Sequence, residues 1–473
     1  MAARERRSVR ARRTRTGTLA EGAVRPHWHH QPRAVDGGRV SGGFRGPDLP
    51  ALADLQNCIH CGFCLPVCPT YIATGQELES PRGRLHLVRA VLDGKAEATD
   101  RLLSHLDLCL QCRACESACP SQVPYGRIME DARAATMARG ARDRPRAWTL
   151  RALALRYVLA RPRVLRSVLA LARLYTRSGL QRLVRGPLAR ALPAPLRALE
   201  AQAPVLDRAP FRRSGVLARP QAMRARVALL TGCVHGELYP QMHEATVSVL
   251  TRLGCEVVAP PAQVCCGALH THAGDAETAR ALARRNIAAF EAAGVDAVIV
   301  NAAGCSAAMK EYGRLLRSDA RWALRAERFA SGVRDVLEYV AAQDFAAPGL
   351  GAVPGDVTLQ DACHLAHAQR IRSAPRAILG AIPGLRLREM QTPDRCCGAA
   401  GLYALVQGEM SRTVLASKMA EIAATGAHLI ATANPGCTLQ LEAGVRRSGL
   451  DAGVRHVIEL LDESYRAAAA ARG

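Results

Sequence analysis

The pattern of apolar and polar positions predicts a helical region near the N-terminus. In the segment "SPRGRLHLVRAVLDG", residues 80–94, apolar residues recur at helical spacing. Ser80 can cap the first turn of this helix, and Pro81 suits its first position. A second helix is predicted over "ATDRLLSHLDL", residues 98–108. We therefore expect residues 51–145 to form a mostly helical domain.

The C-terminal half has a different pattern. Short β-branched runs such as "AVIV" and "VTLQ" alternate with longer helical patterns such as "SRTVLASKMAEIAATG". This alternation predicts α/β units with parallel strands. The pattern occurs twice, so we predict one α/β domain over residues 223–345 and a repeated one over residues 346–473.

Between these regions, residues 146–222 show helical periodicity that prolines interrupt, which predicts amphipathic helices followed by a Pro-rich linker. The most hydrophobic stretch, Leu150 to Tyr175, contains Arg every few positions and is not expected to span a bilayer. Residues 1–50 are predicted to be a basic, disordered tail. This tail lacks an apolar segment with a cleavage site, so we do not interpret it as a secretory signal.

Charge is concentrated in two segments of the chain. The formal net charge is +23, and residues 1–50 and 151–226 carry +7 and +15 of it. The cysteine-bearing regions are therefore close to neutral. Because aromatic residues make up only 4% of the chain, the usual stacking surface for nucleic acid is also missing. We expect no nucleic-acid partner.

The chain has 17 cysteines, and without a secretory signal we expect metal ligands rather than disulfides. The runs "CIHCGFCLPVCP" and "CLQCRACESACP" share the spacing and the proline of bacterial ferredoxins, in which the fourth cysteine of each run binds the other cluster. The predicted ligands are Cys58, Cys61, Cys64 and Cys119 for one [4Fe-4S] cluster, and Cys109, Cys112, Cys115 and Cys68 for the second.

Zinc is the alternative metal for these two runs, but a zinc site needs two spaced pairs of cysteines and has no use for the third cysteine of each loop. His60 and Gln111 are interpreted as exposed residues or as residues near the ligands, not as ligands.

Eight further cysteines form a second pattern, built around the tripeptide Cys-Cys-Gly. Cys233, Cys265, Cys266 and Cys305 correspond to Cys363, Cys396, Cys397 and Cys437. Each set offers four sulfurs at predicted junctions of strands and helices, which suits one [4Fe-4S] cluster or one zinc ion. We expect at least one set to bind a further cluster, the second being favoured because His364 is a candidate extra ligand or a residue at the rim. Cys255 is predicted to be a buried core residue.

These motifs resemble a known family. "CIHCGFCLPVCPTYIATGQELESPRGRLHL", "CLQCRACESACPSQVPYGRIME" and two Cys-Cys-Gly domains are similar to the iron-sulfur subunit of glycolate oxidase, also called glycolate dehydrogenase. The resemblance covers residues 51–465. Related families are the third subunit of anaerobic glycerol-3-phosphate dehydrogenase, lactate-utilisation iron-sulfur proteins and heterodisulfide reductase subunits. In the last, each Cys-Cys-Gly domain ends in Cys-x2-Cys, whereas this chain reads "CSAA" and "CTLQ", so a heterodisulfide-cleaving site is not expected.

The resemblance implies an electron-transfer subunit in an oxidoreductase complex. No Gly-x-Gly-x-x-Gly follows a predicted strand, and a hydride requires an acceptor such as flavin, so no catalytic residue is assigned to this chain. The implied partners are an FAD-containing 2-hydroxy acid oxidase subunit, a second flavin-type subunit as a further candidate, and a membrane quinone. The implied location is cytoplasmic, on the inner face of the cell membrane.

Other interpretations stay open. The basic helices near residues 150–190 suit an anionic membrane surface or an acidic partner, or they form a solvated face packed on the α/β domain. The chain could instead serve a lactate or glycerol-3-phosphate dehydrogenase, carry a catalytic cluster of its own, or act as a redox-sensing module.

Overall fold

A computed structural model describes residues 43–138, 146–188 and 190–472 of the chain, and these residues lie in one compact unit. Most of the predicted tail lies outside the described residues. Its last part, however, is packed: Phe44 is fully buried in the core of the helical region, and the Arg45 N–H donates to the Ala135 carbonyl at 3.2 Å. The packed structure therefore begins before residue 51.

The N-terminal region is mostly helical, as predicted. Its elements are α1 (Leu52–Gln56), α2 (Pro69–Thr74), η1 (Glu77–Glu79), α3 (Pro81–Leu92), α4 (Asp100–Asp107), α5 (Ala114–Ser117) and α6 (Tyr125–Met137). The predicted start of α3 is confirmed, because Ser80 accepts a hydrogen bond from the Gly83 N–H at 3.0 Å. Leu85, Val88 and Val91 of this helix are buried.

The connecting segment contains amphipathic helices. Its elements are α7 (Arg146–Ala154), the π-helical turn η3 (Leu155–Leu159), α8 (Pro162–Arg177), α9 (Leu180–Arg185) and α10 (Ala194–Gln202). In the described part of the chain, no helix is long and apolar enough to cross a bilayer. α8 is held on the α/β region by Arg173, which donates to the Glu237 carbonyl at 2.7 Å.

Two sheets with the same strand order form the C-terminal half. The first sheet contains β1 (Gly215–Ala218), β2 (Ala225–Leu229), β3 (Cys255–Ala259), β4 (Ala297–Val300) and β5 (Val333–Asp335), in the order β1-β3-β2-β4-β5. The second contains β6 (Gly355–Leu359), β7 (Leu385–Leu387), β8 (Leu429–Thr432) and β9 (Gly453–His456), in the order β7-β6-β8-β9. All pairings are parallel except that of β1, which runs antiparallel to β3. The predicted repeat of parallel α/β units is thus confirmed, with β1 as an addition from the linker sequence.

Helices of the two repeats pack against each other. The first sheet is accompanied by α11 (His235–Leu238), α12 (Pro240–Arg252), α13 (Ala268–His272), α14 (Ala276–Glu291), α15 (Ala303–Lys310), α16 (Tyr312–Leu315), α17 (Ala323–Gly332) and α18 (Val336–Ala341). The second is accompanied by η4 (His364–Ala368), α19 (Ser373–Ala381), α20 (Tyr403–Val406), α21 (Gly408–Ala424), α22 (Pro435–Ser448) and α23 (Val457–Ala470). α12 packs on α23, and α19 packs on α18, so each repeat covers the other. One apolar core includes residues of both sheets, such as Val227 and Val357.

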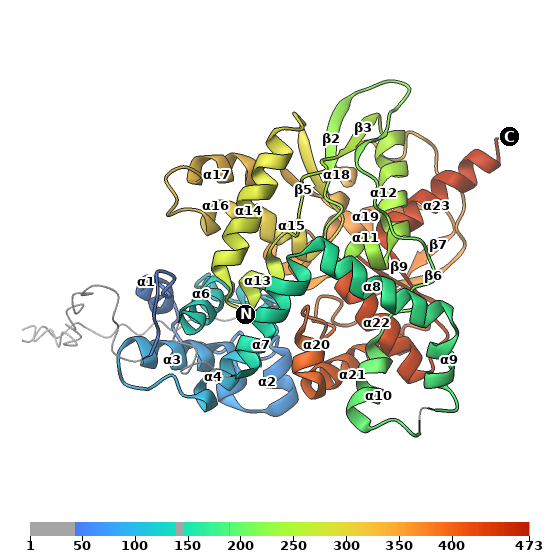
Figure 1. Cartoon of the computed structure of the whole chain (residues 1–473). Helices are drawn as coiled ribbons and strands as arrows, with labels where there is room; N and C mark the ends of the chain where they lie inside the picture. The colour runs from blue at the N-terminus through green and yellow to red at the C-terminus, as the bar shows by residue number, and fades with distance from the viewer. Residues whose placement is uncertain (1–42, 139–145, 189, 473) are drawn as a thin grey trace, which may run out of the picture. The chain divides into compact units, whose positions relative to one another are not determined.

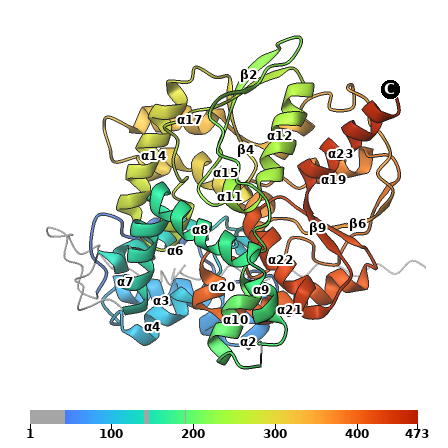
Figure 2. The same cartoon turned by 45° about the vertical axis from the view of Figure 1, so that its right-hand side comes forward.

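The helical region contacts both repeats. α6 contacts α13 of the first repeat, whereas α2 and α5 contact α21 and η4 of the second. In both views the blue helices lie below the yellow part of the chain and beside the red part (Figure 1; Figure 2). Segments that carry cysteines in distant parts of the sequence are therefore brought close together.

Arg84 of α3 connects the segments around the two ferredoxin-type runs. Its buried guanidinium pairs with Glu79 at 2.7 Å, donates to the His105 carbonyl at 2.6 Å and donates to the Thr70 hydroxyl at 3.1 Å. Arg82, two residues earlier on the same helix, forms an exposed ion pair with Glu77. The two arginines thus make the same kind of pair in opposite environments.

Replacing Arg84 with Met should lower the free energy of unfolding by about 3 kcal/mol, because the Glu79 carboxylate would stay buried without its guanidinium partner. Denaturant unfolding of the anaerobic protein, followed by circular dichroism, measures this change. The control Arg89→Met removes the exposed pair with Asp93 at the other end of the helix and should leave the midpoint unchanged, since exposed ion pairs contribute little. Equal midpoints for the two variants would contradict the role given to Arg84.

Candidate metal centres

The structure brings the eight ferredoxin-type cysteines together in two groups. One pocket is lined by Cys58, Cys61, Cys64 and Cys119, with Cys115 also at its wall. A second pocket is lined by Cys68, Cys109, Cys112 and Cys115. In each pocket, three cysteines of one run meet the fourth cysteine of the other run. This grouping is the one that the spacing predicts for two cubane clusters.

The two ferredoxin-type loops follow the same backbone path. His60 and Gln111, each two residues after the first cysteine, have φ values of 56° and 55°. Two residues later, Gly62 and Arg113 have φ values of 88° and 62°. Such positive φ angles turn the chain sharply, so that successive cysteines can face one point.

The environments of the two loops differ. In the first loop Ile59 and Phe63 are 68% and 62% exposed, and Cys61 is exposed as well. In the second loop Cys109, Cys112 and Cys115 are all buried. His60 is exposed as expected. Gln111 is buried, because the second loop lies against the second repeat.

Burial makes three of the ferredoxin-type thiols hard to ionise. It raises the pKa of Cys64 to about 11 and raises the pKa of Cys115 well above its ordinary value. The pKa of Cys112 is also raised, first by burial and then by the nearby Cys363. Thiolates crowded in this way are stable only if a cation compensates their charge. The backbone N–H of Gln111 donates to Cys109 Sγ at 3.3 Å, a contact that suits a metal-bound sulfur.

The Cys-Cys-Gly cysteines also form two groups, one in each repeat. In the first, Cys233 follows β2, Cys265 and Cys266 follow β3, and Cys305 lies in the first turn of α15. Hydrogen bonds from Cys233 and Cys266 lower the pKa of Cys265, while the pKa of each of these two neighbours is raised. Among these three thiols, Cys265 is therefore the one whose thiolate is favoured.

The second group repeats this geometry. Cys363 follows β6, Cys396 and Cys397 follow β7, and Cys437 lies in the first turn of α22. Hydrogen bonds from Cys396 and Cys437 lower the pKa of Cys397, and the pKa of each donor is raised. The donor set of each group, four buried or partly buried thiols drawn from three separated segments, fits an iron-sulfur cluster.

The glycine of each Cys-Cys-Gly turn is required by the backbone. Gly267 and Gly398 have φ values of 84° and 88°. Their N–H groups donate to the sulfurs of Cys265 and Cys396 at 3.5 and 3.4 Å. At Gly398, an added Cβ would lie 2.7 Å from the Ser411 carbonyl oxygen. A larger residue would therefore displace the turn that presents the two adjacent cysteines.

Within the described residues, no three His, Cys, Asp or Glu side chains are arranged to hold a single metal ion. A mononuclear zinc site needs its ligands to converge on one atom. In a cubane each cysteine binds a different iron, so its four sulfurs surround a larger volume. The cluster interpretation of the ferredoxin-type cysteines is supported by their spacing and by their grouping in two pockets.

Two residues near the second group were not identified from the sequence. Lys418 of α21 is only 1% exposed, donates to the Thr392 carbonyl at 2.5 Å, and its charge contributes to the low pKa of Cys397. Asn434 donates to Cys437 Sγ at 3.5 Å. The one available signal for Lys418 was its rarity, since the chain has three lysines.

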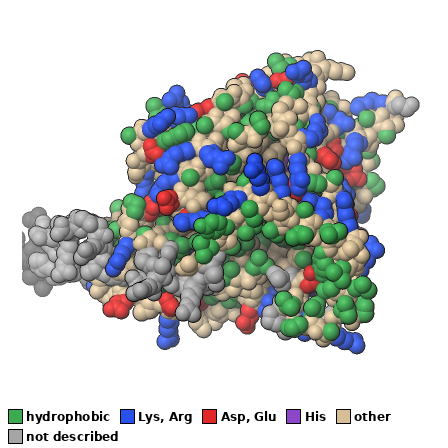
Figure 3. Space-filling model, in the orientation of Figure 1, with side chains coloured by type: hydrophobic (Ala, Val, Ile, Leu, Met, Phe, Trp, Pro, Cys, Tyr) green, Lys and Arg blue, Asp and Glu red, His purple; other side chains and the backbone are tan. Residues whose placement is uncertain are grey.

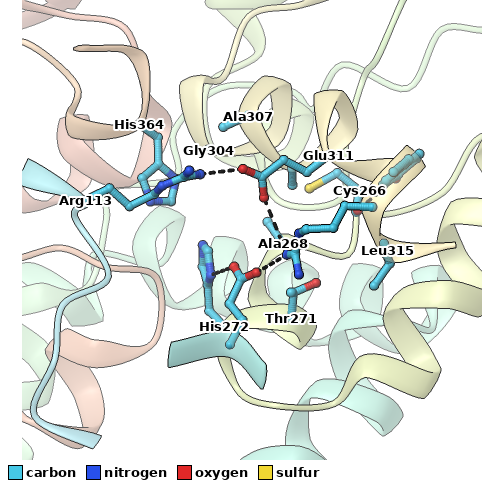
Figure 4. Close-up of a pocket in the computed structure, with 14 residues that line it drawn as sticks. Arg113, Cys266, Ala268, Thr271, His272, Gly304, Ala307, Glu311, Leu315 and His364 are labelled. Carbon is cyan, nitrogen blue, oxygen red and sulfur yellow. Dashed lines mark hydrogen bonds and ion pairs between the residues drawn. The ribbon is translucent and has the colours of Figure 1, made fainter. Parts of the chain in front are cut away.

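The helical region and both repeats meet in a pocket lined by charged residues (Figure 4). Arg113 of the second ferredoxin-type loop pairs with Glu311 at 2.5 Å, and Glu130 of α6 pairs with Arg314 and, at 3.1 Å, with His272. These pairs join the helical region to the first repeat.

His364 is directed into this junction. Its Nε2–H donates to the Gln111 carbonyl at 2.9 Å, and its ring lies edge-on to His272 with 5.2 Å between the centroids. Burial lowers the pKa of His364 to about 3, so the ring is neutral. It lines the pocket that contains Cys266, and thus connects the second repeat with the ferredoxin-type loop.

Comparisons with known proteins agree with this organisation. A 4Fe-4S dicluster domain matches residues 54–123. The cysteine-rich domain model matches residues 227–310 and 357–442, one copy in each repeat. The model of the glycolate oxidase iron-sulfur subunit linker region matches residues 147–203, which contain the helices from α7 to α10.

Relatives match nearly the whole chain. The chain is 43% identical over 418 residues to a probable glycolate oxidase iron-sulfur subunit of Bacillus subtilis (strain 168), covering 87% of this chain and 94% of the relative. It is 34% identical over 421 residues to the glycolate oxidase iron-sulfur subunit of Escherichia coli (strain K12), covering 88% and 95%. The chain belongs to the glycolate oxidase iron-sulfur subunit family. Lactate utilization protein A 2 of Bacillus mycoides (strain KBAB4) is more distant, with 29% identity over 238 residues, which are 50% of this chain and 98% of the relative.

Membership of this family confirms the resemblance seen in the motifs. It also confirms the fold class, a ferredoxin-type dicluster domain followed by two Cys-Cys-Gly domains. The protein is accordingly an iron-sulfur protein. The number of clusters and the ligand of each iron remain predictions.

Replacing both Cys396 and Cys397 with Ser should remove about four irons per chain while about eight or more remain, because the two ferredoxin-type clusters keep their ligands. Iron analysis and electron paramagnetic resonance of anaerobically purified protein measure the loss. A matched variant, with Cys265→Ser and Cys266→Ser, tests in the same way whether the first repeat binds a cluster. Unchanged iron and an unchanged spectrum in both variants would assign these cysteines to packing or partner docking.

Proposed function

We propose that the chain is the electron-transfer subunit of a glycolate or other 2-hydroxy acid oxidase complex. It would pass electrons from an FAD-containing partner through two [4Fe-4S] clusters, and at least one further cluster, toward a membrane quinone. Iron-sulfur clusters supply one-electron transfer, whereas the hydride removed from a 2-hydroxy acid needs a flavin. The chain's own residues would hold the clusters, exclude water from them and dock the partners.

The order of the cysteine groups carries this proposal. The pocket of Cys58 and Cys61 opens at the surface, and Cys115 lies on the walls of both ferredoxin-type pockets. Beyond it, Cys112 packs in one apolar cluster with Cys396 of the second repeat. The groups thus follow each other from an exposed loop to the buried junction, the arrangement expected of a conductor rather than of isolated structural sites.

Electrons would enter at the first loop. Ile59 and Phe63 are large apolar side chains that stand exposed beside Cys61. Exposed apolar groups at a redox centre suit a protein partner that excludes water on docking. We assign this face to the flavin-containing partner. The two relatives named as glycolate oxidase subunits favour glycolate as its substrate, and the relative named for lactate utilization supports lactate as the second candidate.

The connecting helices support attachment to a membrane surface. On α8, Val168, Leu171 and Leu174 lie on one face and are 47%, 69% and 65% exposed. On α9, Leu180 and Leu183 continue this apolar surface. In Figure 3, green side chains gather where Figure 1 places α8, α9 and α10, with arginines beside them. An exposed apolar helix face bordered by Arg is the pattern of helices that lie in an anionic bilayer surface.

Replacing Cys112 with Ser tests the relay. Electron transfer from the flavin partner to quinone should fall to background, because the path from the exposed loop to the second repeat would be interrupted. Reduction of an artificial dye by the partner should continue. The control is Cys255→Ser, since Cys255 lies outside all four groups and contacts the Tyr339 hydroxyl at 3.4 Å. Quinone reduction that survives Cys112→Ser would overturn the proposed path.

Replacing Leu171 and Leu174 together with Asp should weaken binding to anionic vesicles at least about tenfold, because each buried Leu contributes roughly 1.5–3 kcal/mol. Flotation with vesicles that contain phosphatidylglycerol measures binding. The control is Leu324→Asp, an equally exposed leucine of α17 far along the chain. Equal flotation of all variants would show that α8 does not contact lipid.

A further inference from the structure

A cavity of about 290 Å³ lies between α8 and the first Cys-Cys-Gly group. Cys233 and Cys265 form part of its wall, and Leu165 and Arg166 of α8 form another part. Its volume is at the lower end of the range found for small-molecule sites, which is about 300–1,000 Å³. A ligand with one or two rings would fit it and would touch two of the cysteines.

The walls combine apolar and cationic groups. Leu159, Phe211 and Val264 supply apolar surface. Arg212 and Arg213 lie beside them. This combination suits a flat organic ring that carries oxygens on which negative charge develops.

The arginines differ in how far they are already paired. Arg212 pairs with Glu237 at 2.8 Å, and Arg213 donates to the Leu217 carbonyl at 2.6 Å. Arg166 makes no hydrogen bond or ion pair with any residue that the structure describes. Its guanidinium is thus free to bind a group that enters the cavity.

The position of the cavity links it to the proposed membrane surface. Leu165 of α8 is buried toward the cavity, whereas Leu171 and Leu174 of the same helix are exposed. A lipid-soluble ligand that leaves a bilayer beneath α8 would therefore reach the cavity by passing one helix. Access from the membrane and contact with a redox group are both required of a quinone site.

We infer that this cavity binds the ring of the quinone acceptor, next to Cys233 and Cys265, with Arg166 and Arg213 at its oxygens. The inference rests on the proposed function. Reduction of the quinone to quinol takes up two electrons and two protons. The electrons would come, one at a time, from a cluster held by the first Cys-Cys-Gly group, which the relay would reach through the junction that Cys266 lines together with Arg113 and His364. The protons would come from water, to which the cavity is open.

Photolabelling with a short-chain azido-quinone tests this site without relying on turnover. In the cluster-containing protein, label should be found in peptides around Arg166, Arg213 and Cys265, and excess unlabelled quinone should remove it. Arg166→Ala and Arg213→Ala should each weaken quinone binding about tenfold, the loss expected for one charge-assisted hydrogen bond. The control is Arg219→Ala, because Arg219 of the nearby segment is 73% exposed and pairs with Glu256 outside the cavity.

The iron content and the paramagnetic spectrum of each variant confirm that its clusters are intact. Label confined to other peptides, or equal affinities in all variants, would overturn the cavity as the quinone site. If the wild-type complex still reduces quinone in that case, the proposed function stands and only the site is wrong. If the wild-type complex reduces dyes but no quinone, the proposed acceptor itself fails.

Discussion

The structure depends on one electrostatic constraint: sulfur atoms of buried cysteines are crowded together, and their negative charge must be compensated. Burial raises the pKa of several ferredoxin-type thiols, and within each Cys-Cys-Gly group hydrogen bonds between thiols lower the pKa of one cysteine and raise the pKa of two neighbours. Iron in a cluster supplies the missing positive charge, so cluster binding and the packing of these segments are coupled. Every group draws its cysteines from separated segments. Cluster binding would therefore join the two ferredoxin-type runs in the helical region, and in each repeat it would join the loops after two strands to the helix that carries the last cysteine.

Much of the fold was predictable because local rules agree with the final structure. Ser80 caps α3 as the sequence indicates, and the strands that end before Cys233 and Cys363 follow from their β-branched residues. The repeat was visible because corresponding cysteines keep almost the same spacing. Cross-grouping of the two ferredoxin-type runs follows from the short loops, which allow three of their cysteines, but not the fourth, to face the same point.

The rest depends on tertiary contacts that a local pattern does not contain. Gln111 and His60 occupy equivalent places in their loops, yet only Gln111 is buried, because only the second loop lies against a repeat. The position of His364 beside Cys363 predicts either an extra ligand or a residue at the rim of the site. The structure directs its ring to the Gln111 carbonyl, a contact that depends on how the two domains meet. Phe44 was assigned to a tail because its neighbours are polar and glycine-rich, although it fills the helical core.

The two Cys-Cys-Gly groups are alike in geometry but lie in different surroundings. The second faces the ferredoxin-type loop, with Cys396 packed near Cys112. The first faces α8 and an open cavity. The same cysteine pattern thus lies in two different surroundings, without a change in the residues that define the cysteine group.

The reciprocal packing of the repeats has a consequence for their history. α12 of the first repeat covers α23 of the second, and α19 of the second covers α18 of the first. A contact in which two equivalent surfaces exchange equivalent partners is the contact of a symmetric dimer. A single-repeat ancestor would have needed a second copy of itself to bury these helices. A single chain that carries both copies keeps that partner permanently in place, so the surroundings of the two cysteine groups can differ while the core stays shared.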